Sequence, residues 1–444
     1  MALTCDGYIY YSAPENQLLG DYSYLLVVLA EWCGAPLMPT MTQSPIWQGT
    51  SGFRELKIQT IARTRRTMAT ATPKRSPIFE ALAAKLSSGP AQKLEDAFYN
   101  PRPQSYWYHD GTTWVEATSS PPPTITSSFN PTKIRLISWN IDILVPFSVE
   151  RMSAALNYLS SLVSQTPAST PIVIYLQEMG QSDLSQIRDT RWVQEKFYIT
   201  EYDERNWLSP LCGTTMLVDR RLRVQNVFRV PWISKFERDG LFVDIGLIPL
   251  SPSGSPSASA GEETPKPNAL RLCNCHLESL IADPPIRPLQ LSAAATYLRE
   301  DGISAALLAG DLNAIQPFDH TLHSSNGLKD AYLELGGVED SDDGYTWGYQ
   351  IPEYLKGKFG CSRMDKILFR GEVKAETFER IGMGVMVAEE KREEVREAGE
   401  LEWVTDHYGV MGDFSLEEWR LLGVGAGRNF RETDMLRPVI LARH

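Results

Sequence analysis

The chain has 444 residues, of which 43% are hydrophobic and 10% aromatic, a composition typical of a globular protein with a large core. Its formal net charge is −12. The segment 54–75 holds seven basic residues and one acidic residue, so it contributes +6 and the rest of the chain sums to −18. An acidic body of this kind excludes non-specific duplex binding through a broad basic face, although it leaves local binding at an end or in a groove open.

Cysteine spacing and the length of the apolar runs indicate the cellular compartment in which we expect the protein. The six cysteines form no CxxC pair and no zinc-ligand spacing, which favours a reducing compartment over a disulfide scaffold. No apolar run reaches the roughly 18 residues that would predict a membrane span. The basic segment 54–77 has the composition of an organelle-targeting or nuclear signal, but we prefer to interpret it as a disordered arm. We expect an intracellular protein, in the nucleus or alternatively in the mitochondrion.

The first 131 residues differ in character from the rest. Residues 1–75 show no sustained periodicity, which predicts a disordered basic extension. A short amphipathic helix is expected within 78–97. Residues 101–118 place four aromatic side chains around an Asp-Gly turn, which predicts a small hairpin that packs its aromatics against another surface. Residues 119–131 are rich in Pro, Ser and Thr, so we assign 76–131 to a hairpin and helix segment followed by a linker.

From Lys133 onward, strands and helices alternate. Two amphipathic helices are predicted, over 149–163 and 289–298. Strands are predicted over 134–141, 172–176, 214–218, 241–248, 269–276, 305–310, 364–369 and 408–414. Because several neighbouring strands lack a helix between them, we predict an α/β domain of mixed sheets covered by helices. Its range is 132–418, interrupted by a disordered insertion over 251–268 and a charged helical insert over 387–402, and followed by a C-terminal tail over 419–444.

Polar residues recur where the predicted strands end. The stretch 305–309 reads as a buried strand, and Gly310, Asp311 and Asn313 follow it directly. A single such residue is well explained as a turn cap or a satisfied core residue. Seven of them on consecutive elements of one domain indicate a site instead. They are Asn140, Glu178, His276, Asp311, Asn313, Asp406 and His407.

The chemistry of this set points to phosphoester hydrolysis. Glu178 is a hard oxygen donor that suits Mg²⁺, which prefers one or two carboxylates. Asp311 can orient and deprotonate an attacking water, and two histidines and two asparagines can donate hydrogen bonds to phosphate oxygens. Soft ligands are too few for a zinc cage, and no GxxxxGK[ST] loop is present. Metal-assisted hydrolysis of a phosphoester is the reaction that these groups serve.

Six short motifs carry a resemblance to a known family. In content and order they resemble the endonuclease/exonuclease/phosphatase superfamily, and within it most closely the 5′-tyrosyl-DNA phosphodiesterases, over about 133–416. The motifs are SWNID (138–142), LQEM (176–179), CHLES (275–279), GDLN (310–313), SRMDKILF (362–369) and TDHYGV (405–410). The resemblance implies a four-layer α/β/β/α sandwich of two mixed sheets flanked by helices, with the active site at one rim.

The resemblance also implies roles for the metal-side residues. Glu178 would bind Mg²⁺, with Mn²⁺ as a possible replacement, and Asn140 and Asp142 would support the metal through water. Asp311 would be the general base. Asn313 would position water and phosphate.

On the phosphate side, the resemblance implies that His407 stabilises charge on the phosphorane. Asp406 would orient that histidine or assist the metal. His276 and Ser279 would touch the phosphate, and Trp347 would stack on a DNA base.

One position departs from the family pattern. The GDxN motif of the family is typically followed, at the second position, by an arginine that contacts DNA phosphate, and here that position is Ile315. Arg363 or Lys366 is a candidate substitute. We therefore expect substrate contact from Arg363, and we expect DNA affinity or register to differ at Ile315.

The expected function is Mg²⁺-dependent removal of tyrosyl adducts from DNA 5′ ends by a monomeric enzyme. The alternatives are another superfamily hydrolase, such as an abasic-site endonuclease, an RNA deadenylase or a lipid phosphatase. A non-catalytic alternative is a partner-binding protein that docks through the aromatic hairpin around 106–114.

Overall fold

The computed structural model describes residues 2–5, 8–11, 98–117, 129–209, 211–250 and 268–424. The chain divides into two compact units, Met1–Ala83 and Ala84–His444. In the first unit, strands β1 (Ala2–Cys5) and β2 (Tyr8–Tyr11) pair antiparallel, within a stretch for which the sequence predicts no regular structure. The remainder of the predicted extension, the helix within 78–97, most of the linker and the insertion up to residue 267 lie outside the described residues.

The second unit contains two mixed β-sheets. One of them, called the β13 sheet here, has β12 and β13 parallel and the other neighbours antiparallel. Strand β19 (Trp419–Leu421) pairs with β11 beside the main path of this sheet. The main path runs β14 (Lys329–Asp330), β15 (Asp365–Gly371), β13 (Ile303–Asp311), β12 (Asn268–His276), β11 (Asp239–Pro249), β10 (Val224–Pro231) and β3 (Arg102–Pro103).

The other sheet is called the β6 sheet, and here β6 and β7 are the parallel pair. Strand β17 (Glu379–Ile381) pairs with β18 beside the main path. The main path runs β16 (Val373–Ala375), β18 (Gly409–Leu416), β6 (Lys133–Asn140), β7 (Ile172–Met179), β9 (Gly213–Asp219), β8 (Phe197–Ile199), β4 (Trp107–His109) and β5 (Trp114–Glu116).

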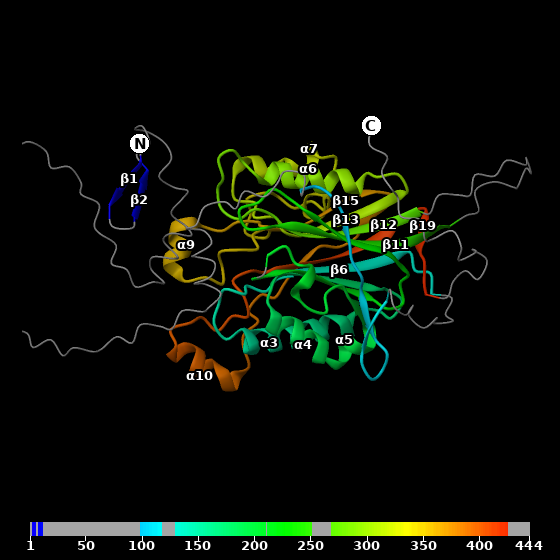
Figure 1. The fold of residues 1–444 in the computed structure, drawn as a ribbon, viewed down its shortest axis with the longest axis horizontal. Helices are drawn as coiled ribbons and strands as arrows, with labels where there is room; N and C mark the ends of the chain where they lie inside the picture. Colours follow the sequence, from blue (N-terminus) through cyan, green and yellow to red (C-terminus); the bar gives the residue numbers. More distant parts are fainter. Residues whose placement is uncertain are drawn as a thin grey trace, which may run out of the picture. The chain divides into compact units, whose positions relative to one another are not determined.

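Helices cover the outer faces of both sheets, which confirms the predicted four-layer sandwich (Figure 1). Helices α6 (Arg287–Leu298) and α7 (Leu322–Ser325) pack on the β13 sheet. Helices α3 (Ser148–Gln165), α4 (Gln181–Asp189) and α5 (Arg191–Lys196) pack on the β6 sheet. Further short helices are α8 (Ala331–Glu334), α9 (Glu353–Phe359) and α10 (Glu389–Glu397), with 3₁₀ turns at Glu204–Asn206 and Pro317–His320. Among the described helices, none has both the length and the apolar character needed to cross a membrane.

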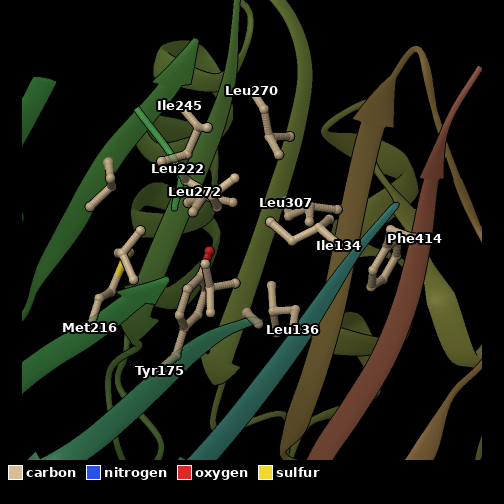
Figure 2. Close-up of a cluster of buried hydrophobic side chains, with 14 of the residues drawn as sticks. Ile134, Leu136, Tyr175, Met216, Leu222, Ile245, Leu270, Leu272, Leu307 and Phe414 are labelled. Carbon is tan, nitrogen blue, oxygen red and sulfur yellow. The ribbon is translucent and has the colours of Figure 1, made fainter. Parts of the chain in front are cut away.

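The strands are hydrophobic on both faces because each sheet is covered twice. Along β6, Ile134 and Leu136 point into the layer between the sheets, and Ile137 and Trp139 point toward α3. Figure 2 shows the inter-sheet layer, where Ile134 of the β6 sheet meets Leu307 of the β13 sheet. This layer fixes the spacing of the two sheets and hence of any groups at their rim.

The aromatic hairpin predicted around 106–114 forms, and it is strands β4 and β5 of the β6 sheet. Its β4 strand pairs with β8 through Trp107 and Ile199. The ring of Tyr106 lies 5.1 Å from that of Tyr198, and the ring of Trp107 lies 4.8 Å from that of Tyr202. The surface against which these aromatics pack is therefore the same unit. Both this hairpin and β19 contribute strands from outside the predicted range 132–418.

Candidate active site

The candidate site lies where the parallel strands of both sheets end at one rim. Asn140 is the last residue of β6, His276 of β12 and Asp311 of β13. Across the β13 sheet, His276 is in register with Asp311, and Asp311 with Asp365, the first residue of antiparallel β15. Carboxyl ends of parallel strands are where open α/β folds place their ligands, so this rim is the expected location for a site.

The two-residue period of the strands aims these side chains into the gap between the sheets. Leu272 of β12 and Leu307 of β13 face the inter-sheet layer, and His276 and Asp311 continue the same faces at even spacing. The apolar face of each strand thus becomes polar at its last residue. Gly310 permits this close packing, because a side chain there would overlap the carbonyl oxygen of Cys275 and its φ is +148°.

Glu178 reaches the same gap through a β-bulge. The pairing of β7 with β9 shifts register after Leu176 and resumes at Met179. The three-residue step from Leu176 to Met179 on β7 therefore lies opposite a two-residue step on β9, which is a β-bulge. Glu178 has a φ of +54°, a left-handed conformation that costs a non-glycine residue about 1 kcal/mol or more. The bulge turns the Glu178 side chain to the rim, where its carboxylate lies 3.7 Å from Nε2 of His276.

Asp311 is the hub of the site. One carboxylate oxygen accepts a hydrogen bond from Nδ2 of Asn140 at 3.1 Å and lies 3.3 Å from Nε2 of His276 and 3.7 Å from Nε2 of His407. The other oxygen accepts from the amide of Asn313 at 2.8 Å. Burial acts to raise the pKa of Asp311, but the two imidazoles and the Asn313 amide outweigh it and hold that pKa below its usual range. Asp311 is therefore a carboxylate at neutral pH.

His407 is held by a buried carboxylate behind it. Its Nδ1 lies 2.8 Å from Oδ2 of Asp365, and Asp365 is fully buried. Burial alone would lower the pKa of His407, but Asp365, Asp406 and Asp311 around it raise it well above the usual value. The ring is consequently a cation whose Nε2 points to the same space as Asp311.

His276 is electrostatically different. Neither ring nitrogen has a hydrogen-bond partner among the described residues, although the side chain is buried. Burial lowers its pKa, and the nearby Arg238 guanidinium lowers it further, against the opposing pull of Asp311 and Glu178. The pKa values of the two site histidines are thus shifted in opposite directions. An unsatisfied buried imidazole is the kind of group that a bound ligand or water would satisfy.

The acidic side of the site has the donor set for a divalent cation. Ligand atoms of Glu178, His276 and Asp311 lie within 4.8 Å of one another. Burial raises the pKa of Asp142 well above its usual value, and the charges of Asp406 and Glu178 raise it further. Carboxylate oxygens are the ligands that Mg²⁺ prefers, and a cation would relieve the repulsion between them. The residues present therefore fit a hard divalent metal ion.

The structure brings together most of the residues that the sequence singles out. Asn313 donates from Nδ2 to the carbonyl of Leu277, and Thr405 ties the TDH loop to the Asn140 carbonyl. Ser279 lies at the margin, where its Oγ accepts a hydrogen bond from Arg238 at 2.9 Å. The residues that share the rim are Asn140, Asp142, Glu178, His276, Asp311, Asn313, Asp406 and His407.

Two predicted substrate contacts are buried within the fold. The sequence predicts that Arg363 meets the substrate, whereas its side chain is 1% exposed and forms ion pairs with Asp330 and Glu339. Such a guanidinium has no free donor face for DNA. Trp347, predicted to stack on a base, is also buried, and its Nε1 donates to Oδ2 of Asp406 at 2.7 Å. In this structure it supports Asp406 rather than presenting a ring to solvent.

Sequence reasoning missed Arg238. It lies in the turn between β10 and β11, its guanidinium contacts Ser279, and it acts electrostatically on His276. A pocket beside His276 is lined by this loop and by residues on both sides of Cys212. A lone arginine in a hairpin turn carries no sequence signal, because only the fold brings that turn to the strand ends.

The sequence around the site matches a known protein family. Residues 137–407 match the Endonuclease/Exonuclease/phosphatase family. The chain belongs to this family. Members of the Endonuclease/Exonuclease/phosphatase family are metal-dependent hydrolases of the phosphodiesterase and nuclease type, and the matched range includes each of the strand ends described above. A comparison with curated proteins gives no significant match.

Solved structures similar to this member of the family include three of different origin. Each aligns with 64% of this chain. A Danio rerio TDP2 complexed with single strand DNA product is 19% identical over 99% of its own chain, with a TM-score of 0.46. Truncated Caenorhabditis elegans TDP2 is 20% identical over 97% of its chain, with a TM-score of 0.45. The human Nocturnin catalytic domain with bound sulfate anion is 16% identical over 94% of its chain, with a TM-score of 0.41.

Proposed function

We propose that this protein is a Mg²⁺-dependent phosphodiesterase that hydrolyses 5′-phosphotyrosyl bonds between a protein tyrosine and a DNA end. The observation that carries the hydrolase chemistry is the convergence of Asp311 with the imidazoles of His276 and His407 and with the Glu178 carboxylate at one rim. The choice of a tyrosyl-DNA bond rests on the WNID and HLES motifs and on the leaving-group argument below.

The chain's own residues can divide the reaction between them. Asp311, ionised and fixed by Asn140 and the Asn313 amide, orients a water and takes its proton as the new P–O bond forms. His407, protonated and backed by Asp365, donates from Nε2 to a non-bridging phosphate oxygen as charge develops there. His276, kept neutral by burial and Arg238, offers a further donor beside it.

The metal site would be built on Glu178, with Asn140, Asp142 and Asp406 around it. When bound, Mg²⁺ or Mn²⁺ supplies charge neutralisation at the phosphoryl oxygens. Oxygen donors outnumber the His276 imidazole among the groups around Glu178, which supports a hard cation over zinc.

The leaving group explains why a phenol ester suits this site. A tyrosyl oxygen departs as a phenolate with a pKa of about 10, whereas a sugar alkoxide is far more basic and needs a proton donor. The groups around Asp311 are two imidazoles and the Glu178 carboxylate, and a phenolate leaving group asks less of them than an alkoxide would. Arg238 stands at the margin as a fixed positive charge that would favour a departing phenolate.

We further propose that the enzyme acts as a monomer on DNA ends in the nucleus. The acidic body disfavours broad duplex contact, which is consistent with recognition of an end.

The test is an assay with a 5′-phosphotyrosyl oligonucleotide and Mg²⁺. We expect release of 5′-phosphorylated DNA by the wild type and loss of release in Glu178→Ala. Side-by-side turnover of an abasic duplex, a poly(A) RNA and an inositol phospholipid separates the other hydrolase functions. Turnover of one of those in preference to the tyrosyl ester would overturn the proposed substrate. No release of 5′-phosphate, or release unaffected by Glu178→Ala, would overturn the proposed reaction.

A further inference from the structure

A buried amide joins the two sheets directly beneath the candidate site. Asn274 lies on β12, two residues before His276, and its side chain faces the inter-sheet layer. Its Nδ2 donates to the carbonyl of Leu176 at 3.1 Å and to the carbonyl of Thr215 at 2.9 Å. Its Oδ1 accepts from Nε2 of Gln177 at 2.8 Å. All of these partners belong to the β6 sheet, so one side chain of the β13 sheet bonds two strands of the other.

The carbonyls that Asn274 binds stand at the edge of the β7 bulge. Leu176 and Thr215 are the last regular pair before the register shift that ends at Met179. Glu178 is two residues past Leu176, just as His276 is two residues past Asn274. The bridge therefore sits at equal chain distance from a proposed metal ligand on one sheet and its neighbouring imidazole on the other.

The bulge needs such support. A glutamate in the left-handed region persists only where the surrounding structure fixes it. The inter-sheet layer below this point is largely apolar, and apolar packing sets a mean spacing of the sheets but no register between specific backbone atoms. Directed contacts between the sheets are therefore few, and Arg229 of β10 makes another of them with the Thr214 carbonyl of β9. The three hydrogen bonds of Asn274, two donated and one accepted, fix specific atoms of the two sheets against each other at this point.

We propose that Asn274 is a positioning residue that holds the Glu178 bulge against His276 and Asp311, and so sets the affinity of the metal site. The proposal rests on the proposed function, because it takes Glu178 to be a metal ligand. Partners that orient a metal ligand typically change metal affinity by about 10- to 100-fold when removed.

The experiment measures Mn²⁺ binding directly, by the electron paramagnetic resonance signal of free Mn²⁺, in the full chain without substrate. Asn274→Leu removes both donors and the acceptor without adding charge, and we expect it to raise the Kd for Mn²⁺ at least about tenfold. Asn274→Ser keeps a single hydroxyl donor and should fall between Asn274→Leu and the wild type. This second variant carries the test if Asn274→Leu does not fold.

Leu272→Ala is the matched control. Leu272 lies on the same face of the same strand, two residues further from the site, and is equally buried (Figure 2). The Leu272→Ala substitution loosens the same layer without touching the bulge. We therefore expect the Kd of this variant for Mn²⁺ to stay within about twofold of the wild-type value.

Three results would overturn the inference. Either both Asn274 variants bind Mn²⁺ as the wild type does, or Leu272→Ala weakens binding as much as they do. The third result is wild-type affinity in Glu178→Ala, which would overturn the proposed metal site and this inference with it. Normal Asn274 variants beside a defective Glu178→Ala would overturn the inference alone and leave the proposed function standing.

Discussion

Asp311 combines two properties that seldom occur together, complete burial and a depressed pKa. We predict that Asp311→Asn lowers turnover of the tyrosyl oligonucleotide by about 10²- to 10⁴-fold, the usual contribution of a general base, with little change in substrate affinity. Single-turnover rates and a binding titration separate the two quantities. Asp343→Asn, an exposed loop carboxylate, is the control and should act as the wild type. A loss of less than tenfold in Asp311→Asn would remove Asp311 from the role of base.

A second residue-scale prediction concerns the buried cluster around Arg363. Burial acts to raise the pKa of Glu339, but its hydrogen bond to Arg363 and the charges of Lys366 and Arg363 outweigh this and lower it. Because the folded-state pKa lies below the unfolded value of about 4.3, the ion pairs stabilise the fold above that pH. The stabilisation disappears as pH falls through the folded pKa.

Glu339→Gln should therefore be less stable than the wild type at pH 7, and the difference should shrink on acidification. Denaturant unfolding between pH 7 and pH 3 measures it. Glu393→Gln, on the exposed face of α10, should show no such trend. A gap between Glu339→Gln and the wild type that is constant with pH would contradict the shifted pKa.

At the scale of elements, the strand ends were predictable and their cross-connections were not. Alternation along β6 and β12 and the continuous apolar run of β13 predict the three strands that end at Asn140, His276 and Asp311. The β7 bulge depends on a register with β9 that the sequence of β7 does not contain. Arg363 resembles a surface cation in sequence because its partners, Asp330 and Glu339, are 33 and 24 residues away.

The hairpin β4–β5 gives a prediction at this scale. Its aromatics pack on β8 and on Tyr202, so Trp107→Ala should destabilise the fold by about 1–3 kcal/mol, less than the cost at a fully buried tryptophan. Turnover per folded molecule should be unchanged, because β9 and β8 separate the hairpin from β7 in the β6 sheet. Thermal unfolding and active-site titration measure both. Unchanged stability together with loss of a bound partner would favour the partner-docking alternative.

At the scale of the whole molecule, the proposed metal site couples to folding. A cation bound by the folded state alone raises the free energy of unfolding by about 2.7 kcal/mol at a metal concentration 100 times its Kd. We predict that Mg²⁺ raises the melting temperature, that EDTA reverses the rise and abolishes turnover, and that Glu178→Ala loses the rise. A melting temperature indifferent to Mg²⁺ in the wild type would contradict a metal site on Glu178.

The charge distribution gives a further whole-molecule prediction. Outside segment 54–75 the chain sums to −18, so acidic side chains outnumber the cationic ones that could meet a DNA backbone, and Arg363 is occupied within the fold. Each phosphate neutralised on a single strand steepens the slope of log K against log salt by about 0.7. Recognition confined to an end, with two or three phosphate contacts, predicts a slope of about −2 or shallower between 50 and 200 mM salt. The comparison is between the wild type and a chain with Arg63, Arg65 and Arg66 changed to Gln, which should share this slope. A slope of about −4 or steeper in the wild type, with a shallower slope in the triple Arg→Gln variant, would contradict this prediction. It would show that the basic segment, rather than the rim between the sheets, provides the electrostatic affinity for DNA.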